Sequence, residues 1–356
     1  MNACRVPVVL FVFNRPGKLR RLLSVLAEVR PTALLVIADG PRVGHPEDII
    51  RCREVRELIA RVDWPCEIVR NYADVNLGCD PRVESGLDWA FEQVDEAILL
   101  EDDLNPDPSF FRWCAEMLSR YRDVPSVVQI SGRNELGRWD GDGGDHHLVW
   151  HGLQLGWATW RRAWRAARAV VLPGEQSILD RHLARWGVDP LVAEHYQLRL
   201  MSAAAGGQNA WDERWSLQLA LIGGLTVVSP VNLVAHEGFD EEATHSRNPA
   251  DMRGLVPVGQ APTPSIGTKL KLDNRLDRWS ILLLLMRGFH DPVMLRRLFR
   301  APSLVSRLRY RLRPFNTPAE SLSALQHLRN VASHPGNLDR LIEVMEAAIR
   351  DQVDER

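Results

Sequence analysis

Three consecutive carboxylates follow a short apolar segment near residue 100. The segment 97–100 reads Ala-Ile-Leu-Leu and runs directly into Glu101, Asp102 and Asp103. Neighbouring like charges raise one another's pKa unless a cation lies between them. Mg2+ and Mn2+ prefer oxygen ligands, typically one or two carboxylates together with phosphate oxygens of a substrate. The cluster therefore indicates either a divalent metal site that bridges a diphosphate, or an acidic N-terminus for the helix expected from residue 108.

Two further apolar segments end in polar residues. The segment 7–13 is followed by Asn14 and Arg15, and the segment 33–38 is followed by Asp39. In an open parallel sheet, ligands bind beyond the carboxyl ends of the strands, so these side chains belong to the same candidate site. Neither a G-x-G-x-x-G loop nor a Walker lysine motif is present in the sequence. These absences argue against a dinucleotide-dependent dehydrogenase and a P-loop NTPase.

Alternating elements must position these residues. Short apolar runs predict strands at 7–13, 33–38, 67–70, 97–100 and 127–131, and helical spacing predicts helices at 16–29, 46–62, 80–94 and 108–121. This β-α-β rhythm predicts an α/β fold with a mostly parallel sheet and helices on both faces. Domain boundaries are expected in the glycine-rich stretch after residue 131 and in the proline- and glycine-rich stretch around residue 260. The expected organisation is 1–131, 132–250, a linker at 251–274 and a helical appendage at 275–356.

The composition is that of an ordinary globular protein. The 356 residues are 45% hydrophobic and 25% charged with a formal net charge of −2, which excludes global disorder and a chain that attracts polyanions by its overall charge. The five cysteines include no closely spaced metal or redox pair, so we expect reduced thiols. No apolar run resembles a signal peptide or reaches the length of a membrane span, and we therefore expect a cytoplasmic protein.

Six segments resemble nucleotide-sugar-dependent glycosyltransferases of the GT-A fold, most closely bacterial relatives of the N-acetylglucosaminyltransferase I type. The resemblance spans about residues 6–245 and is carried by Val8–Pro16, Asn76–Phe91, Leu99–Phe111, Gly152–Trp157, Trp211–Trp215 and Asn232–Phe239. The acidic triplet with its following Pro and Phe-Phe is the most specific part. The resemblance implies a Rossmann-like GT-A domain at 1–250, with a nucleotide-binding half at 1–131 and an acceptor half at 132–250.

The resemblance also implies roles for single residues. The metal, Mn2+ or Mg2+, would be held by Asp103, with His236 as a later ligand. The nucleotide-sugar donor would be bound by Asn14, Arg15, Asp39, Asn76, Gly78, Arg82, Glu101, Asp102, Gly156 and Trp157. Each has a plainer interpretation that stays open: turn or capping polarity for Arg15 and Asp39, a surface helix position for Arg82, and a bend in a tryptophan-rich core for the segment 152–157. His236 can equally be a structural histidine.

A base for the acceptor hydroxyl is implied at the start of a helical pattern near residue 211. Asp212 matches the position best, and Glu213 is the reserve candidate. A carboxylate there can take a proton from a hydroxyl as it attacks the anomeric carbon. The alternative is that Asp212 caps the helix. A rival metal cluster is formed in sequence by His146, His147 and His151 near Asp142 and Asp145, although its spacing is irregular.

The expected function is therefore an inverting, metal-dependent transfer of a sugar from a nucleoside diphosphate donor to a hydroxyl of a glycan or lipid-linked acceptor. A sugar-1-phosphate nucleotidyltransferase and a non-catalytic glycan- or membrane-binding scaffold remain as alternatives. The first lacks its glycine-rich first loop, since Phe13-Asn14-Arg15-Pro16 stands in that place. The second is disfavoured by the intact acidic triplet.

An arginine-rich amphipathic stretch lies near the C-terminus. Residues 287–313 contain eight arginines and one acidic residue, Asp291, with apolar residues between them. This pattern is typical of a peripheral contact with an anionic membrane surface, here the inner face, or of a helical appendage with a solvated arginine face. No nucleic-acid recognition motif accompanies it, so nucleic acid is not an expected partner.

Overall fold

The computed structural model describes residues 4–141, 144–207, 210–239, 253–263 and 270–286. The described strands are β1 Val8–Val12, β2 Ala33–Ala38, β3 Glu67–Tyr72, β4 Glu96–Glu101, β5 Leu104–Pro106, β6 Val127–Ser131, β7 His147–Val149, β8 Trp157–Trp160, β9 Leu225–Val228 and β10 Val234–His236. The described helices are α1 Pro16–Val29, α2 Pro46–Ala60, α3 Cys79–Gln93, α4 Ser109–Tyr121, α5 Arg161–Arg168, α6 Gln176–Trp186, α7 Pro190–Ala204, α8 Trp211–Leu221 and α9 Asn274–Met286.

Eight of these strands form one central sheet in the order β3-β2-β1-β4-β8-β6-β9-β7. The pairs within β3-β2-β1-β4 are all parallel, as is the pair β6-β9. Strands β8 and β7 run antiparallel to their neighbours. The predicted α/β fold with a mostly parallel sheet is therefore confirmed, with two reversed strands that the rhythm of the first 130 residues did not predict.

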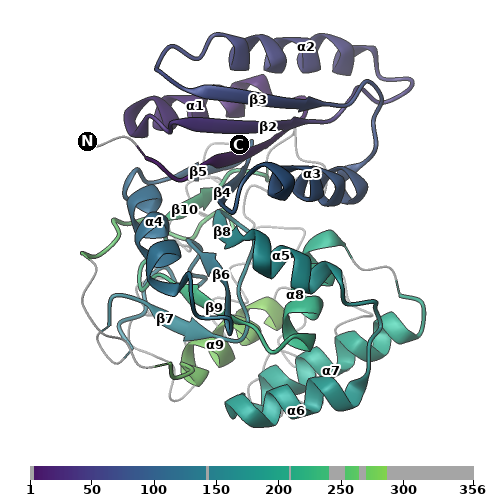
Figure 1. Cartoon of the computed structure of the whole chain (residues 1–356), viewed down its shortest axis with the longest axis vertical. Coiled ribbons are helices and arrows are strands. Elements are labelled where there is room, and N and C mark those ends of the chain that lie inside the picture. The colour runs from purple at the N-terminus through teal and green to yellow at the C-terminus, as the bar shows by residue number, and fades with distance from the viewer. Residues whose placement is uncertain (1–3, 142–143, 208–209, 240–252, 264–269, 287–356) are drawn as a thin grey trace, which may run out of the picture.

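Apolar side chains on both faces of the sheet explain why its strands read as continuous apolar runs. Along β1, Val8 and Leu10 pack into one hydrophobic core and Val9 into the other. The first core also takes side chains from α1, α2 and α4, and the second takes them from α3, α5 and α8. Figure 1 shows β1, β2 and β3 with α1 to α3 in the upper part of the molecule, and the second half of the sheet with α5 to α9 below.

Helix α1 illustrates how local sequence sets the element that follows β1. Pro16 occupies its first turn, where a missing N–H costs nothing. Leu19, Leu22 and Leu26 recur at helical spacing and are fully buried against the sheet. The helix ends at Arg30, whose left-handed backbone (φ 49°) closes the last turn onto Leu26. The short connection from β1 to α1 therefore places Asn14 and Arg15 at the carboxyl edge of the sheet.

A second, two-stranded sheet pairs β5 with β10 in antiparallel register. Leu104 lies opposite His236, and Pro106 lies opposite Val234. Because Leu104 directly follows the acidic triplet, this pairing brings His236 from 130 residues away to the side of Asp103. Strands of three residues carry no periodic signal, and the sequence did not predict this sheet.

Helix α9 packs against α7 and β7. Both carboxylate oxygens of its Asp277 accept backbone N–H groups, from Trp150 at 2.6 Å and from His151 at 2.8 Å. No helix in the described part of the chain is long and apolar enough to cross a membrane. The predicted membrane-contact segment 287–313 lies outside the described residues, and the domain boundaries stay a prediction.

Candidate active site

Hydrogen bonds join the residues that follow β1 to the acidic residues at the end of β4. The Phe13 N–H donates to Oδ2 of Asp102 at 3.1 Å. Nη1 of Arg15 donates to Oδ1 of Asp102 at 3.1 Å and to Oδ2 of Asp103 at 2.8 Å. Adjacent parallel strands thus bring Arg15, Asp102 and Asp103 together, as the sequence predicted.

His236 completes one side of this cluster. Its Nε2 lies 3.8 Å from Oδ2 of Asp103, a distance too long for a hydrogen bond. Its Nδ1 is buried and has no hydrogen-bond partner among the described residues. Gly238 lies directly against the pair: a methyl group added there would lie 2.5 Å from Oδ2 of Asp103 and 2.7 Å from Nε2 of His236. Only a residue without a side chain leaves the space in front of these two atoms open.

The three carboxyl groups differ in pKa because their surroundings differ. Burial and the charges of Asp103 and Asp102, with a further contribution from Asp212, raise the pKa of Glu101 to about 8. Burial raises the pKa of Asp102 to about 6 although the charge of Arg15 opposes it. Burial also acts on Asp103, but His236, Arg15 and Lys18 outweigh it and hold its pKa at about 2. Asp103 therefore keeps its negative charge to a lower pH than Glu101 or Asp102 does.

Asp103 and His236 fit a divalent cation by the chemistry of their atoms. One ionised carboxylate oxygen and one imidazole nitrogen face each other across the space that Gly238 leaves open. Mn2+ accepts both donor types, and such ions usually take the rest of their ligands from water and substrate phosphate. The described residues contain no group of three or more His, Cys, Asp or Glu side chains placed to hold a metal by themselves. A metal here would need the oxygens of a bound ligand.

Asp212 lies in the first turn of α8. The residue that caps α8 is Ala210, so Asp212 does not act as the N-cap. Its side chain is exposed, and one oxygen accepts only the neighbouring N–H of Glu213 at 2.9 Å. Its charge contributes to the raised pKa of Glu101. Glu213 shares this first turn.

Two contacts hold the start of α8 in place. Nη2 of Arg199 in α7 donates to the backbone carbonyl of Glu213 at 2.8 Å. Arg214 forms an ion pair with Glu84 of α3 at 2.7 Å and a longer one with Asp80 at 3.4 Å. The exposed carboxylate of Asp212 therefore stands on a helix that is fixed to both α7 and α3.

The carboxylate of Asp39 organises the loop that follows β3. It accepts hydrogen bonds from the N–H groups of Gly40, Leu77 and Gly78 and from Nδ2 of Asn76, all between 2.8 and 3.1 Å. Gly78 has a φ of +83°, a conformation that favours glycine. The structure thus brings Asp39, Asn76 and Gly78 together, and the carboxylate is already engaged in shaping this loop.

Asn14 and Arg82 are also tied to their neighbours. Nδ2 of Asn14 donates to Oδ1 of the buried Asp48 at 2.6 Å. Arg82 is buried, and it donates to the carbonyl of Ala38 at 3.2 Å and to Oδ1 of Asn71 at 2.9 Å. Arg82 is therefore not on the surface of α3: it joins the carboxyl ends of β2 and β3.

The segment 152–157 combines a close backbone approach with an aromatic core. Gly156 has a φ of +70°, and a methyl group there would lie 2.6 Å from the Val234 side chain of β10. Trp157 begins β8 and is almost fully buried, with its ring 6.3 Å from that of Trp211 and 5.6 Å from that of Trp215. Gly156 thus supports the strand that carries His236, and Trp157 packs within the core beneath α8.

The rival histidine cluster is dispersed among separate partners. His146 contacts the Tyr121 hydroxyl and lies 2.8 Å from Oδ1 of Asp145. His147 lies 3.0 Å from Oδ2 of Asp273. His151 lies 3.0 Å from the Tyr196 hydroxyl. Asp142 is outside the described residues. Among the described residues, no side chain contacts all three histidines.

Several residues of the site were not predicted. Lys18 is almost fully buried, and its Nζ donates to the carbonyl of Glu237 at 2.9 Å while its charge lowers the pKa of Asp103. Asp48 anchors Asn14, and its hydrogen bonds from Arg42 and Asn14 lower its pKa to about 2. Gly238 follows His236 by two residues. A lysine in the first turn after β1 is the only one of these that a sequence signal could have indicated, because this chain has few lysines.

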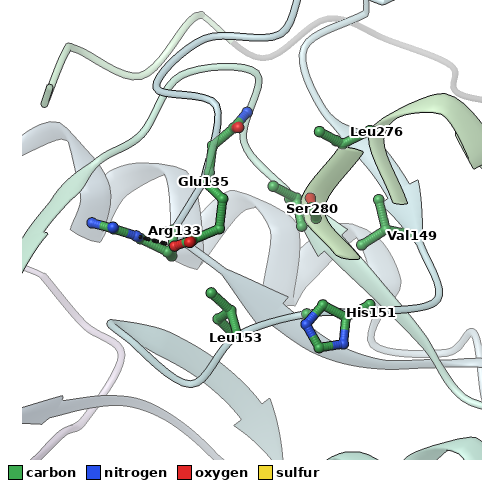
Figure 2. A pocket seen from close by; sticks show the side chains of 10 residues that line it. Arg133, Glu135, Val149, His151, Leu153, Leu276 and Ser280 are labelled. Atoms are coloured by element: carbon green, nitrogen blue, oxygen red, sulfur yellow. Dashed lines mark hydrogen bonds and ion pairs between the residues drawn. The ribbon is translucent and has the colours of Figure 1, made fainter. Parts of the chain in front are cut away.

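A small cavity lies between the loop after β6 and α9. Figure 2 shows Arg133 and Glu135 on one side of it and Val149 and His151 on the other. Its volume of about 10 Å³ is room for about one water molecule, far below that of a nucleotide-binding pocket. Arg133 pairs with Glu135 at 2.6 Å and donates to the carbonyls of Val234 and Arg253. Arg133, which lines the cavity, therefore supports β10, and the cavity is too small to be a substrate site.

No family model and no curated protein sequence matches this chain. Among solved structures, the chain is similar to a mannosyltransferase of Pyrobaculum calidifontis in complex with GDP-Man and Mn2+, at 12% identity and a TM-score of 0.40, over 100% of this chain and 87% of that one. It is also similar to mouse xyloside xylosyltransferase 1 in its apo form, at 12% identity and a TM-score of 0.32, over 60% of this chain and 81% of that one.

Both similar structures are glycosyltransferases. No sequence match supports the resemblance to the N-acetylglucosaminyltransferase I type. Since both TM-scores lie below 0.5, the function proposed below rests on the geometry of this chain's own site.

Proposed function

We propose that this protein is a metal-dependent glycosyltransferase that moves a sugar from a nucleoside diphosphate donor to a hydroxyl of a glycan or lipid-linked acceptor. One observation carries the proposal: Asp103, His236 and the cation Arg15 meet at the carboxyl edge of β1 and β4. A site of this composition suits a ligand that is anionic at one end and has a reacting carbon close to a carboxylate.

The diphosphate end of the donor is assigned to Asp103, His236, Arg15 and Lys18. Asp103 and His236 would hold Mn2+ or Mg2+, which would stabilise the negative charge of the departing diphosphate. The Arg15 guanidinium can pair with two phosphate oxygens at once. Lys18 adds a second buried positive charge beside Asp103. These groups together favour the release of a nucleoside diphosphate.

The nucleoside and sugar are assigned to the surrounding loops. Asn14 and the loop 76–78, shaped by Asp39, lie at the ends of β1 and β3 and are proposed to contact the base and ribose. Arg82 holds the ends of β2 and β3 together beneath that loop. Glu101, Asp102 and the segment around Gly156 are proposed to face the ribose and the donor sugar.

Asp212 is proposed to be the base of an inverting reaction. Its carboxylate is exposed and is not used to cap α8, and its charge contributes to the raised pKa of Glu101 in the acidic triplet. It would accept the proton of the acceptor hydroxyl as the oxygen attacks the anomeric carbon from the side opposite the diphosphate. Glu213 is the second candidate because it occupies the same first turn of α8.

A panel of nucleotide sugars tests this function. With Mn2+ present, we expect at least one UDP-, GDP- or dTDP-sugar to raise the melting temperature and to be hydrolysed slowly to the nucleoside diphosphate. Release of pyrophosphate from a nucleoside triphosphate and a sugar phosphate would instead indicate a nucleotidyltransferase. Failure of every nucleotide and nucleotide sugar to bind would indicate a scaffold without catalysis.

A further inference from the structure

Arg15 occupies an unusual place for a residue that follows a strand. Its guanidinium lies between two acidic side chains, with Nη1 at 3.1 Å from Oδ1 of Asp102 and at 2.8 Å from Oδ2 of Asp103. Its side chain is 14% exposed, and those of Asp102 and Asp103 are 6% and 11% exposed. Solvent screens such contacts little, so the pairing is much stronger than that of a surface ion pair.

Arg15 and a metal ion would both use the same oxygen atom of Asp103. Oδ2 of Asp103 accepts the hydrogen bond from Arg15, and the same Oδ2 faces Nε2 of His236 across 3.8 Å. A divalent cation held by Asp103 and His236 would have to use this oxygen. Two cations at one carboxylate oxygen repel each other, so the guanidinium and the metal compete.

We propose that Arg15 is an internal counter-cation that keeps the metal site weak until the diphosphate of the donor draws its guanidinium away from Asp103. This inference rests on the proposed function and concerns the regulation of the same site. It predicts that metal and donor bind cooperatively. A bound metal repels the Arg15 guanidinium from Asp103, and a bound diphosphate attracts it away from Asp103, so each ligand makes the other easier to bind. The free protein then holds little metal.

The position of Arg15 suits this exchange. It directly precedes α1, whose N-terminus carries a partial positive charge that attracts anions. Lys18 lies one turn further on and is anchored to the Glu237 carbonyl at 2.9 Å, so a positive charge stays near Asp103 when Arg15 moves. A guanidinium binds the paired oxygens of a phosphate as well as it binds those of a carboxylate. A diphosphate is therefore an equivalent partner for the side chain of Arg15.

The test measures Mn2+ binding by the protein without nucleotide, from the electron paramagnetic resonance signal of the free ion. Arg15→Ala should bind Mn2+ at least about tenfold more tightly than the wild type. This factor corresponds to the lower end of the free-energy range for a hydrogen bond to a charged group. Arg15→Lys should lie between the two, since it keeps the positive charge on a shorter side chain that reaches the carboxylates less well. Arg20→Ala, which removes an exposed arginine of the same helix that pairs with Glu54, is the matched control and should bind as the wild type does.

Two outcomes overturn the inference: an Mn2+ affinity of Arg15→Ala equal to or below that of the wild type, or an equal gain in Arg20→Ala. If Arg15→Ala fails to fold by circular dichroism, Arg15→Gln, which keeps a long hydrogen-bonding side chain without the charge, is judged by the same criterion. Repeating the titration with UDP, GDP and dTDP separates the two proposals. A gain in Mn2+ affinity without binding of any diphosphate leaves Arg15 as the competitor and refutes the transferase function.

Discussion

Replacement of Gly238 by alanine tests whether the space between Asp103 and His236 is a metal site. The added methyl carbon would lie 2.5 Å from Oδ2 of Asp103 and 2.7 Å from Nε2 of His236, whereas ordinary contacts begin at 3.4 Å. The difference, 3.4 − 2.5 = 0.9 Å, must be recovered by moving these two side chains. Both atoms are at the ends of side chains, so we expect the metal-binding geometry to suffer more than the fold.

The expected loss follows from this displacement. Disturbing the surroundings of metal ligands typically lowers metal affinity by about 10- to 100-fold, and overpacking costs about 1–3 kcal/mol of stability where the neighbours cannot move. We therefore expect Gly238→Ala to weaken Mn2+-dependent binding of a nucleoside diphosphate by about 10- to 100-fold in isothermal titration calorimetry. Its free energy of unfolding should fall by less than about 2 kcal/mol.

Gly17→Ala is the matched control for this substitution. Gly17 lies in the first turn of α1, near the same site, and a methyl group there would meet nothing within 4 Å. We expect unchanged metal affinity and a stability gain of up to about 1 kcal/mol from the better helix propensity of alanine. A folded Gly238→Ala protein that binds Mn2+ and diphosphate with wild-type affinity would refute the assignment of the metal to Asp103 and His236.

Two further predictions concern Asp212 and Asp277. Asp212→Asn should keep donor binding, because the residue is assigned to the acceptor side, and should lower the transfer rate by about 10²- to 10⁴-fold. Glu213→Gln tests the second candidate: a larger loss there than in Asp212→Asn, or wild-type turnover in Asp212→Asn, would remove Asp212 as the base. Burial raises the pKa of Asp277 to about 7 from its ordinary 3.8, so the folded protein binds more protons than the unfolded chain between these values. Its free energy of unfolding should then fall as the pH rises from 4 to 8, by up to about 4 kcal/mol from this residue alone. Urea titrations at both ends of that range should show a smaller fall in Asp277→Asn than in the wild type, because Glu101 and Asp102, whose pKa values are also raised, contribute equally to both proteins. Equal pH dependence in the two proteins would contradict the burial argument.

Much of the first half of the fold could be predicted because its signals are local. The strands at 33–38 and 127–131 and the helix at 16–29 have the boundaries that apolar runs and proline placement indicated. The strand at 67–70 continues to Tyr72, since edge strands carry a weaker apolar signal. Strand β8 was not predicted: it lies antiparallel between β4 and β6 and is buried throughout, so its tryptophans show no alternation that would distinguish it from a bend.

The candidate site divides in the same way. Arg15, Asp102 and Asp103 could be placed together from sequence, because parallel neighbouring strands end at one edge. The inward placement of Arg82 and the four hydrogen bonds accepted by Asp39 could not, since they depend on how the loops after β2 and β3 fold onto each other. The contact between His236 and Asp103 depends on a three-residue strand pair that no local pattern reveals.

Calorimetric titration of nucleoside diphosphates into the wild type and Asp103→Asn, each with and without Mn2+, tests the central claim most directly. The wild type should bind at least one of UDP, GDP and dTDP tightly only when Mn2+ is present. Asp103→Asn should lose that metal-dependent gain while keeping any weak metal-independent binding through Arg15 and Lys18. Equal diphosphate affinity with and without Mn2+ in the wild type, or an undiminished gain in Asp103→Asn, would contradict the account.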